Sequence, residues 1–217
     1  MKLKQLGLAA LLTLASLTVS ATTMDDVVGL QHTWAKVNYD LTGDAQEKEF
    51  KDLVKLADDV VKASPSSAEA YIWRGIIQSS FAGAKGGLGA LSLAKAAKAD
   101  FEKALSINPE ALKGSAYTSL GTLYAKVPGW PLGFGDDDKA KEMLQKAVAI
   151  NPTGIDANYF YASYLADEGE TAEAEKYLLK AQQAPARPER PVADKGRQKE
   201  IAELLAKLKK EQEEQED

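Results

Sequence analysis

Residues 117–124 read YTSLGTLY, and residues 140–152 read AKEMLQKAVAINP. In the second stretch, apolar residues recur at the first, fifth and eighth positions, so they share one face of a helix. Pro152 cannot continue that helix, because it lacks a backbone N–H and pushes the preceding residue toward extended geometry. The two stretches therefore predict a pair of helices that pack through one apolar face.

The second stretch recurs along the chain with the same spacing before a proline. A series of such units indicates a repeat architecture, in which each helix pair buries its apolar face against the next pair. The further copies are Leu53, Ala57 and Val60 before Pro65; Ala97, Phe101 and Ala104 before Pro109; and Ala174, Leu178 and Ala181 before Pro185, which comes one residue early.

The first stretch carries a half-motif of the form W-x2-L-G-x2-Y. Tyr117, Leu120, Gly121 and Tyr124 stand at its four positions, and the small Gly121 lets two helix backbones approach closely. The chain resembles the tetratricopeptide repeat family in this respect. The resemblance implies an all-α fold, a right-handed α-solenoid of about four helix pairs with a C-terminal capping helix. The expected repeats are residues 28–65, 68–109, 114–152 and 155–185.

Two insertions interrupt the repeat pattern. About ten extra residues fall within 81–96, a Gly/Ala/Leu-rich segment, and about seven fall within 127–136. The first insertion either extends the following helix or closes a pocket beside the solenoid groove. It lacks the Gly-Lys-Ser/Thr ending of a phosphate loop and follows a helix, which argues against nucleotide binding.

The N-terminus has the features of a secretory signal peptide. Lys2 and Lys4 precede a short apolar run, and Val19-Ser20-Ala21 provides small residues before a cleavage site. The apolar run is shorter than a membrane span of about 20 residues. We therefore expect a signal peptide at residues 1–21, a periplasmic mature chain, and no membrane span in that mature chain.

The rest of the chain divides into two parts on this interpretation. Residues 22–185 form the repeat domain, and residues 186–217 comprise a proline-rich linker, a helix and a charged tail. The helix places Ile201, Leu204, Leu205 and Leu208 on one face. A solenoid needs a polar-faced terminal helix to cover its last apolar surface, so this helix is expected to act as the cap.

Composition excludes several classes of function. There is no cysteine, and His32 is the single histidine, so Cys-ligated zinc, thiolate nucleophiles and multi-His metal sites are excluded. The formal net charge of −5 gives no general attraction for nucleic acid. No pair of acid/base groups or nucleophile constellation is recognisable. We expect no catalytic residues, no cofactor and no metal.

The loop at 127–136, VPGWPLGFGD, is the most unusual stretch. Trp130 and Phe134 are large apolar residues between prolines and glycines, and they either fold back onto the helices or form a contact surface. The acids Asp136, Asp137 and Asp138 precede a helix and are expected to cap it rather than bind calcium.

First-helix positions that face the concave side of such a solenoid are mostly small, neutral and hydroxyl-bearing. Plain helix packing is the competing explanation for many of them. The candidate binding residues are therefore Trp130, Phe134 and Tyr159, proposed to form the main contact surface, with Thr118, Thr122 and Ser163.

A closer resemblance rests on the PGWPLGFGD loop, the Ile155–Phe160 helix start and the Arg187–Arg197 tail. The chain looks like periplasmic proteobacterial repeat proteins and, more distantly, like the periplasmic repeat component associated with TRAP-type transporters. This implies a protein–protein interaction or scaffold module with a protein or peptide partner. The alternative is a small-molecule-binding accessory component of a transport system.

Overall fold

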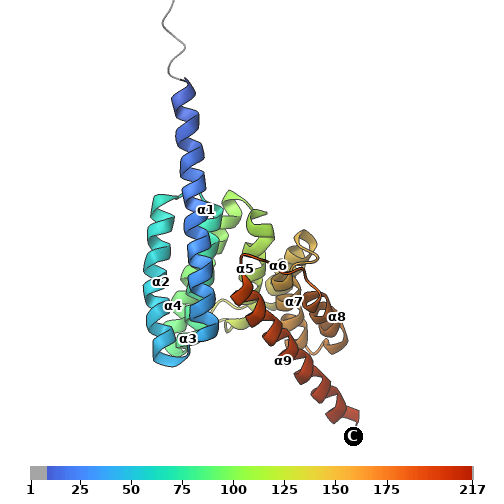
Figure 1. Cartoon of the computed structure of the whole chain (residues 1–217). Helices are drawn as coiled ribbons and strands as arrows, with labels where there is room; N and C mark the ends of the chain where they lie inside the picture. The colour runs from blue at the N-terminus through green and yellow to red at the C-terminus, as the bar shows by residue number, and fades with distance from the viewer. Residues whose placement is uncertain (1–8, 217) are drawn as a thin grey trace, which may run out of the picture.

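The computed structural model describes the backbone of residues 9–216 and the side chains of residues 24–87 and 89–214. The described residues form helices joined by short loops (Figure 1). In chain order these are α1 Ala9–Asp40, α2 Gly43–Ala63, α3 Ala68–Lys85, α4 Gly87–Ile107, the 3-10 turn η1 Ala111–Gly114, α5 Ser115–Lys126, α6 Asp137–Ile150, α7 Ile155–Asp167, α8 Thr171–Gln182 and α9 Pro191–Glu216.

Consecutive helices pair as the repeat pattern predicts. The closest pairs are α3 with α4, α5 with α6, and α7 with α8, and each pair also packs on the next. The second helices bury the predicted faces almost completely: Leu53, Ala57 and Val60; Ala97, Phe101 and Ala104; Ala140, Leu144 and Ala147; Ala174, Leu178 and Ala181. The fold is thus an α-solenoid of stacked helix pairs, as the sequence predicts.

Gly121 marks the closest approach within the third pair. A Cβ at Gly121 would lie 2.7 Å from Cγ of Leu144 and 3.1 Å from the backbone oxygen of Ala140. Gly75 holds the same place in the second pair, where a Cβ would lie 2.6 Å from Cε1 of Phe101. The two glycines are therefore required by packing, because any side chain there would separate the paired helices.

The insertion at 81–96 lengthens both helices of the second pair. Helix α3 continues to Lys85 and α4 begins at Gly87, with Gly86 alone between them at a φ of 62°. Of the two outcomes open from the sequence, the structure selects extension of the helices. None of its described side chains lines the cavity on the concave face described below.

Helix α1 begins well before residue 28, where the first repeat is expected to start. Residues 1–8 of the expected signal peptide lie outside the described residues, and the backbone of residues 9–21 is helical and continuous with the rest of α1. Among the described residues, no helix is long and apolar enough to cross a membrane. Cleavage after Ala21 remains a prediction.

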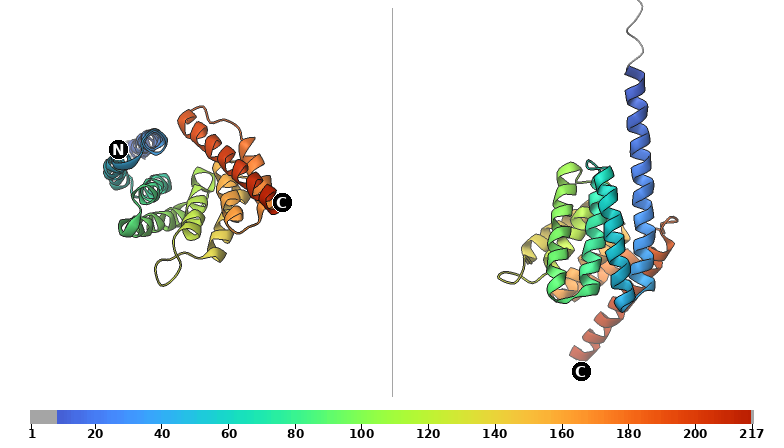
Figure 2. Two further views of the ribbon diagram at one scale, coloured as in Figure 1. Left: turned by 90° about the horizontal axis from the view of Figure 1, so that it is seen from below. Right: turned by 90° about the vertical axis from the view of Figure 1, so that its left-hand side faces the viewer.

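The insertion at 127–136 forms a loop that projects from the helical body (Figure 2). Backbone hydrogen bonds brace its base, from Gly135 N to Pro128 O and from Asp136 N to Tyr124 O, both 3.0 Å long. The Asp136 side chain accepts from Lys139 N at 3.1 Å and so caps α6. The capping function predicted for the acidic run is thus confirmed at Asp136.

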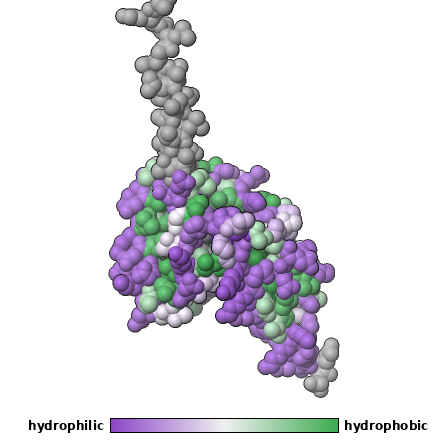
Figure 3. All heavy atoms as spheres, viewed as in Figure 1, coloured by the Kyte–Doolittle hydropathy of each residue, from purple (hydrophilic) through white to green (hydrophobic). Residues whose placement is uncertain are grey.

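Helix α9 does more than the expected cap. It covers α8 through the predicted face, with Ile201 and Leu208 buried. It also contacts α7 and returns to α1, so the two ends of the solenoid approach one another (Figure 2). Its C-terminal half presents mainly hydrophilic side chains to solvent (Figure 3). Helix α9 therefore covers one edge of the concave face.

Candidate functional site

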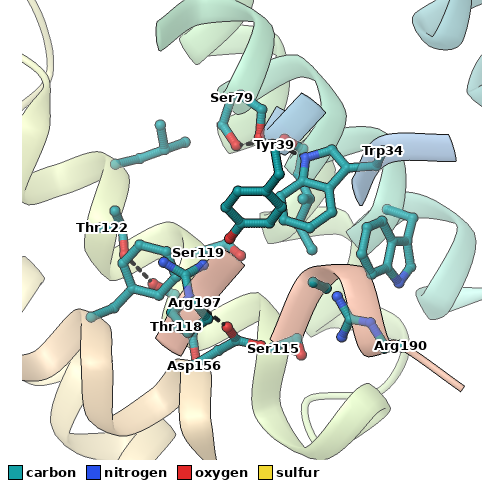
Figure 4. A pocket seen from close by; sticks show the side chains of 16 residues that line it. Trp34, Tyr39, Ser79, Ser115, Thr118, Ser119, Thr122, Asp156, Arg190 and Arg197 are labelled. Atoms are coloured by element: carbon teal, nitrogen blue, oxygen red, sulfur yellow. Dashed lines mark hydrogen bonds and ion pairs between the residues drawn. The ribbon is translucent and has the colours of Figure 1, made fainter. Parts of the chain in front are cut away.

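A cavity of about 120 Å³ lies on the concave side of the solenoid (Figure 4). The first helix of every pair contributes to it, together with the segment that begins α9. The lining residues are Trp34 and Tyr39 of α1; Trp73, Ile76, Ser79 and Ser80 of α3; Ser115, Thr118, Ser119, Thr122 and Leu123 of α5; Asp156 and Phe160 of α7; and Arg190, Ala193 and Arg197.

Aromatic rings form one wall of this concave cavity. Trp34 lies edge-on to Trp73 and to Tyr39, with ring centroids 5.7 Å apart in both pairs. The indole nitrogen of Trp34 donates to Ser80 Oγ at 2.8 Å, which fixes the ring. Burial raises the pKa of Tyr39 well above its ordinary value, so the phenol stays protonated. The wall is therefore rigid and uncharged.

An ionic cluster closes the opposite side. Asp156 accepts from Arg187 at 2.7 Å and from Arg197 at 2.9 Å. Burial alone would raise the pKa of Asp156, but the two guanidiniums outweigh it and hold the pKa well below its usual range. The carboxylate is thus fully engaged and unavailable as a general base.

The same cluster fastens α9 to the repeats. Arg197 also pairs with Glu200, and its guanidinium carbon lies 4.4 Å from the ring centroids of both Tyr159 and Phe160. Arg187 also pairs with Asp194 at 2.6 Å. These ion pairs connect the linker, α7 and α9 through one continuous network of charged side chains.

Arg190 differs from its neighbours. Its guanidinium lies 5.1 Å from the ring centroid of Trp73, a cation–π distance, and its buried Nε has no hydrogen-bond acceptor among the described residues. The indole nitrogen of Trp73 is likewise buried, and no acceptor lies beside it in the described part of the chain. Burial lowers the pKa of Arg190, which reflects the cost of holding this charge away from water.

Several hydroxyls on the lining have their protons engaged by backbone carbonyls. Ser79 donates to Ile76 O at 2.9 Å, Ser115 to Leu112 O at 2.8 Å, and Thr122 to Thr118 O at 2.8 Å. Their free lone pairs remain as acceptors. The cavity therefore combines aromatic surface, hydroxyl acceptors and a cation.

The predicted site residues are distributed over different places. Thr118 and Thr122 line the cavity, and Tyr159 lies beside it, stacked on Arg197. Ser163 is half-buried on α7 and is not among the residues that line the cavity. Trp130 and Phe134 lie on the projecting loop and do not line the cavity either.

The loop residues themselves behave differently. Trp130 is 90% exposed and Leu132 is 73% exposed. Phe134 is half-buried, and its ring lies edge-on to Tyr124 with centroids 6.0 Å apart. The sequence left open whether these two residues fold back onto the helices or form an exposed contact surface. Phe134 folds back onto the helices, whereas Trp130 is exposed.

The sequence patterns do not identify the residues that give the cavity its character. The concave face is not neutral, because Arg190 and Arg197 reach it from the C-terminal segment that was interpreted as linker and cap. Trp34, Tyr39 and Trp73 were not selected either. The tail from Arg187 to Arg197 stood out in the sequence, but no local spacing connects it with residues of α1 or α3.

These features define a class: an all-helical solenoid of tetratricopeptide-like helix pairs closed by a terminal helix. No protein-family model matches the chain, and no curated protein matches it in sequence. Among solved structures, the thermophilic TPR protein TTC0263 of Thermus thermophilus has a TM-score of 0.53 and 20% identity, over 73% of this chain and 75% of that one. This likeness supports the fold.

Two further solved structures superpose on this chain with lower TM-scores. MamA has a TM-score of 0.43 and 24% identity, over 64% of this chain and 74% of that chain. The pilF protein of Pseudomonas aeruginosa has a TM-score of 0.35 and 15% identity, over 87% of this chain and 92% of that chain.

Proposed function

We propose that this chain is a periplasmic scaffold module that binds another protein and performs no catalysis. The observation that carries the proposal is the exposed pair Trp130 and Leu132 on a loop whose base is braced by hydrogen bonds. Large apolar side chains held in water on a fixed loop favour a contact surface, and tryptophan is enriched among binding hot spots. Helical-repeat solenoids are a common framework for such surfaces.

The loop is tested by removing its two apolar side chains. We expect the double variant Trp130→Ala, Leu132→Ala to lose partner capture, measured by chemical cross-linking in the periplasm followed by mass spectrometry. Leu56→Ala is the matched control, because Leu56 is 50% exposed on α2, away from the loop. Equal recovery of the partner by the double variant and the control would contradict the proposal.

The periplasmic location is tested separately. A signal peptide at 1–21 gives a mature chain that begins at or near Thr22. Intact-mass measurement of protein released from the periplasm should show this shortened chain. Recovery of the full-length chain in the cytoplasm alone would contradict the location without affecting the binding proposal.

A second candidate function is a small-molecule-binding accessory component of a transport system. The partly covered concave side favours it, because α9 lies across one side of the groove and leaves an open-sided cavity with an aromatic wall. Ligand sites are concave and largely apolar, with a few placed polar groups. Native mass spectrometry of the protein purified from the periplasm tests it, since a retained ligand adds its mass directly. Protein that is free of ligand and unchanged in melting temperature across a metabolite panel would contradict it.

A further inference from the structure

Among the described residues, two buried N–H donors on side chains that line the concave cavity have no hydrogen-bond acceptor. These are the indole nitrogen of Trp73 and Nε of Arg190, both buried and both on residues that line the cavity. The Arg190 guanidinium lies over the indole ring of Trp73, so the two donors lie close to one another. Buried donors are normally paired, and an unpaired buried charge is costly. The arrangement indicates a missing acceptor.

Neighbouring carboxylates do not supply this acceptor. Asp156 is held by Arg187 and Arg197, and Asp194 is held by Arg187. Among the described side chains, Arg197 pairs with Asp156 and Glu200, and Arg187 pairs with Asp156 and Asp194, which leaves Arg190 as the cation of this cluster without an ion pair. One anionic group on a ligand would give Arg190 the ion-pair partner that it lacks.

We propose that the concave cavity binds a carboxylate, with its oxygens at Arg190 and Trp73 and its apolar body against the aromatic wall. A carboxylate matches the flat donor edge of a guanidinium and carries the single negative charge that would pair with Arg190. A doubly charged phosphate would leave excess negative charge beside Asp156. The site deepens the second candidate function and rests on it; it does not depend on the loop at 127–136.

The space around Arg190 admits a compact ligand or the end of a chain. Next to the 120 Å³ cavity lies a second one of about 370 Å³, and the two share Trp73, Ser115, Thr118, Asp156 and Arg190. Arg190 therefore lies where the two cavities meet. The same carboxylate chemistry could belong to a free aromatic or branched acid, or to the C-terminus of a peptide.

The first test uses the wild-type mature chain and matched ligands in isothermal titration calorimetry. Phenylacetate is compared with phenylacetamide, and a short peptide ending in phenylalanine is compared with its C-terminal amide. We expect at least one acid to bind about tenfold or more tightly than its amide, the size of a charge-assisted hydrogen bond. Preference for the free acid or for the peptide identifies the source.

The second test uses variants of the charge. Arg190→Gln should abolish the preference for the acid over the amide, and Arg190→Lys should retain part of it. Lys113→Gln is the matched control, because it also removes one positive charge. Lys113 lines the larger cavity but not the 120 Å³ concave cavity. Circular dichroism melting curves verify that each variant is folded.

The outcomes separate this inference from the proposed functions. Equal binding of acid and amide would overturn the carboxylate site and leave ligand binding by the cavity intact. Equal weakening by Lys113→Gln and Arg190→Gln would also overturn it, because the attraction would then be general. No binding of either acid would overturn the inference, whereas partner capture through Trp130 is measured independently.

Discussion

Nε of Arg197, on α9, lies 2.9 Å from a carboxylate oxygen of Asp156, in the first turn of α7. The Arg197 side chain is 7% exposed and that of Asp156 is 33% exposed. Arg187, in the linker, pairs with the other oxygen of the same carboxylate. One aspartate thus holds two parts of the C-terminal segment against the repeats and keeps the concave cavity closed.

Replacing Asp156 should loosen this closure. Asp156→Asn leaves two arginines near each other without their shared anion, and we expect a loss of about 2–3 kcal/mol in the free energy of unfolding, below the value for a fully buried pair. Urea melts measure the loss. Asp167→Asn is the control: its pair with Lys126 is about half exposed, so it should cost less than about 1 kcal/mol. Equal effects would refute the assignment.

The contribution of Asp156 should also depend on pH. Its pKa in the folded chain is lowered, since Arg197 and Arg187 outweigh burial, so the stabilisation is present above the unfolded pKa of about 3.9. It is lost as the pH falls toward the folded pKa. The difference in unfolding free energy between wild type and Asp156→Asn should stay constant from about pH 5 to 7 and shrink by up to about 1.4 kcal/mol per unit below about pH 4. A constant difference down to about pH 3 would contradict this.

Packing between the paired helices should make Gly121 intolerant of side chains. In Gly121→Leu the new Cβ would meet Leu144 and the backbone of Ala140, and overpacking of this kind costs about 1–3 kcal/mol. A Cβ at Gly89 would meet only the flexible side chain of Lys85, 2.5 Å from its Cε. Gly89→Leu should therefore be near neutral in urea melts, and equal destabilisation of the two variants would mean that the repeat phase is wrong.

The loop at 127–136 should separate binding from stability. Trp130→Ala should leave the melting temperature nearly unchanged, because the side chain is 90% exposed. Phe134→Ala should lower the stability by about 1–3 kcal/mol, since Phe134 is half-buried against Tyr124. Thermal melts of both variants measure this. A Trp130→Ala variant that melts earlier but captures its partner with unaltered affinity would remove the loop from the proposed contact surface.

The helix pairs could be predicted because their determinants are local. The spacing that places Ala140 and Leu144 on one helix face, the proline that ends each second helix, and the small residue at Gly121 all act within a few residues. The cap at Asp136 and the apolar face around Ile201 follow from the same local rules. Each of these features is fixed by helix geometry before any tertiary contact forms.

The candidate site was predicted only in part. Thr118 and Thr122 were found from their positions in the repeat, because helix phase determines which side of the solenoid they face. Trp130 and Phe134 were grouped with Tyr159 because all three are aromatic and because the loop and the first helix of the fourth repeat are neighbours in a stacked solenoid. The structure places the two loop residues outside the cavity that Tyr159 lies beside. Composition alone does not show which aromatic residues are brought together.

The sequence by itself determined the helices, their pairing and the stacking of one pair on the next, since these depend on residues close together in the chain. Only the tertiary structure decided that α9 returns to α1 and closes the concave side, and that Arg190 lies over Trp73 beside a carboxylate already held by two arginines. The physical reason is that the direction of α9 follows from the accumulated curvature of the whole solenoid and from ion pairs between distant segments, and neither leaves a local pattern in the sequence.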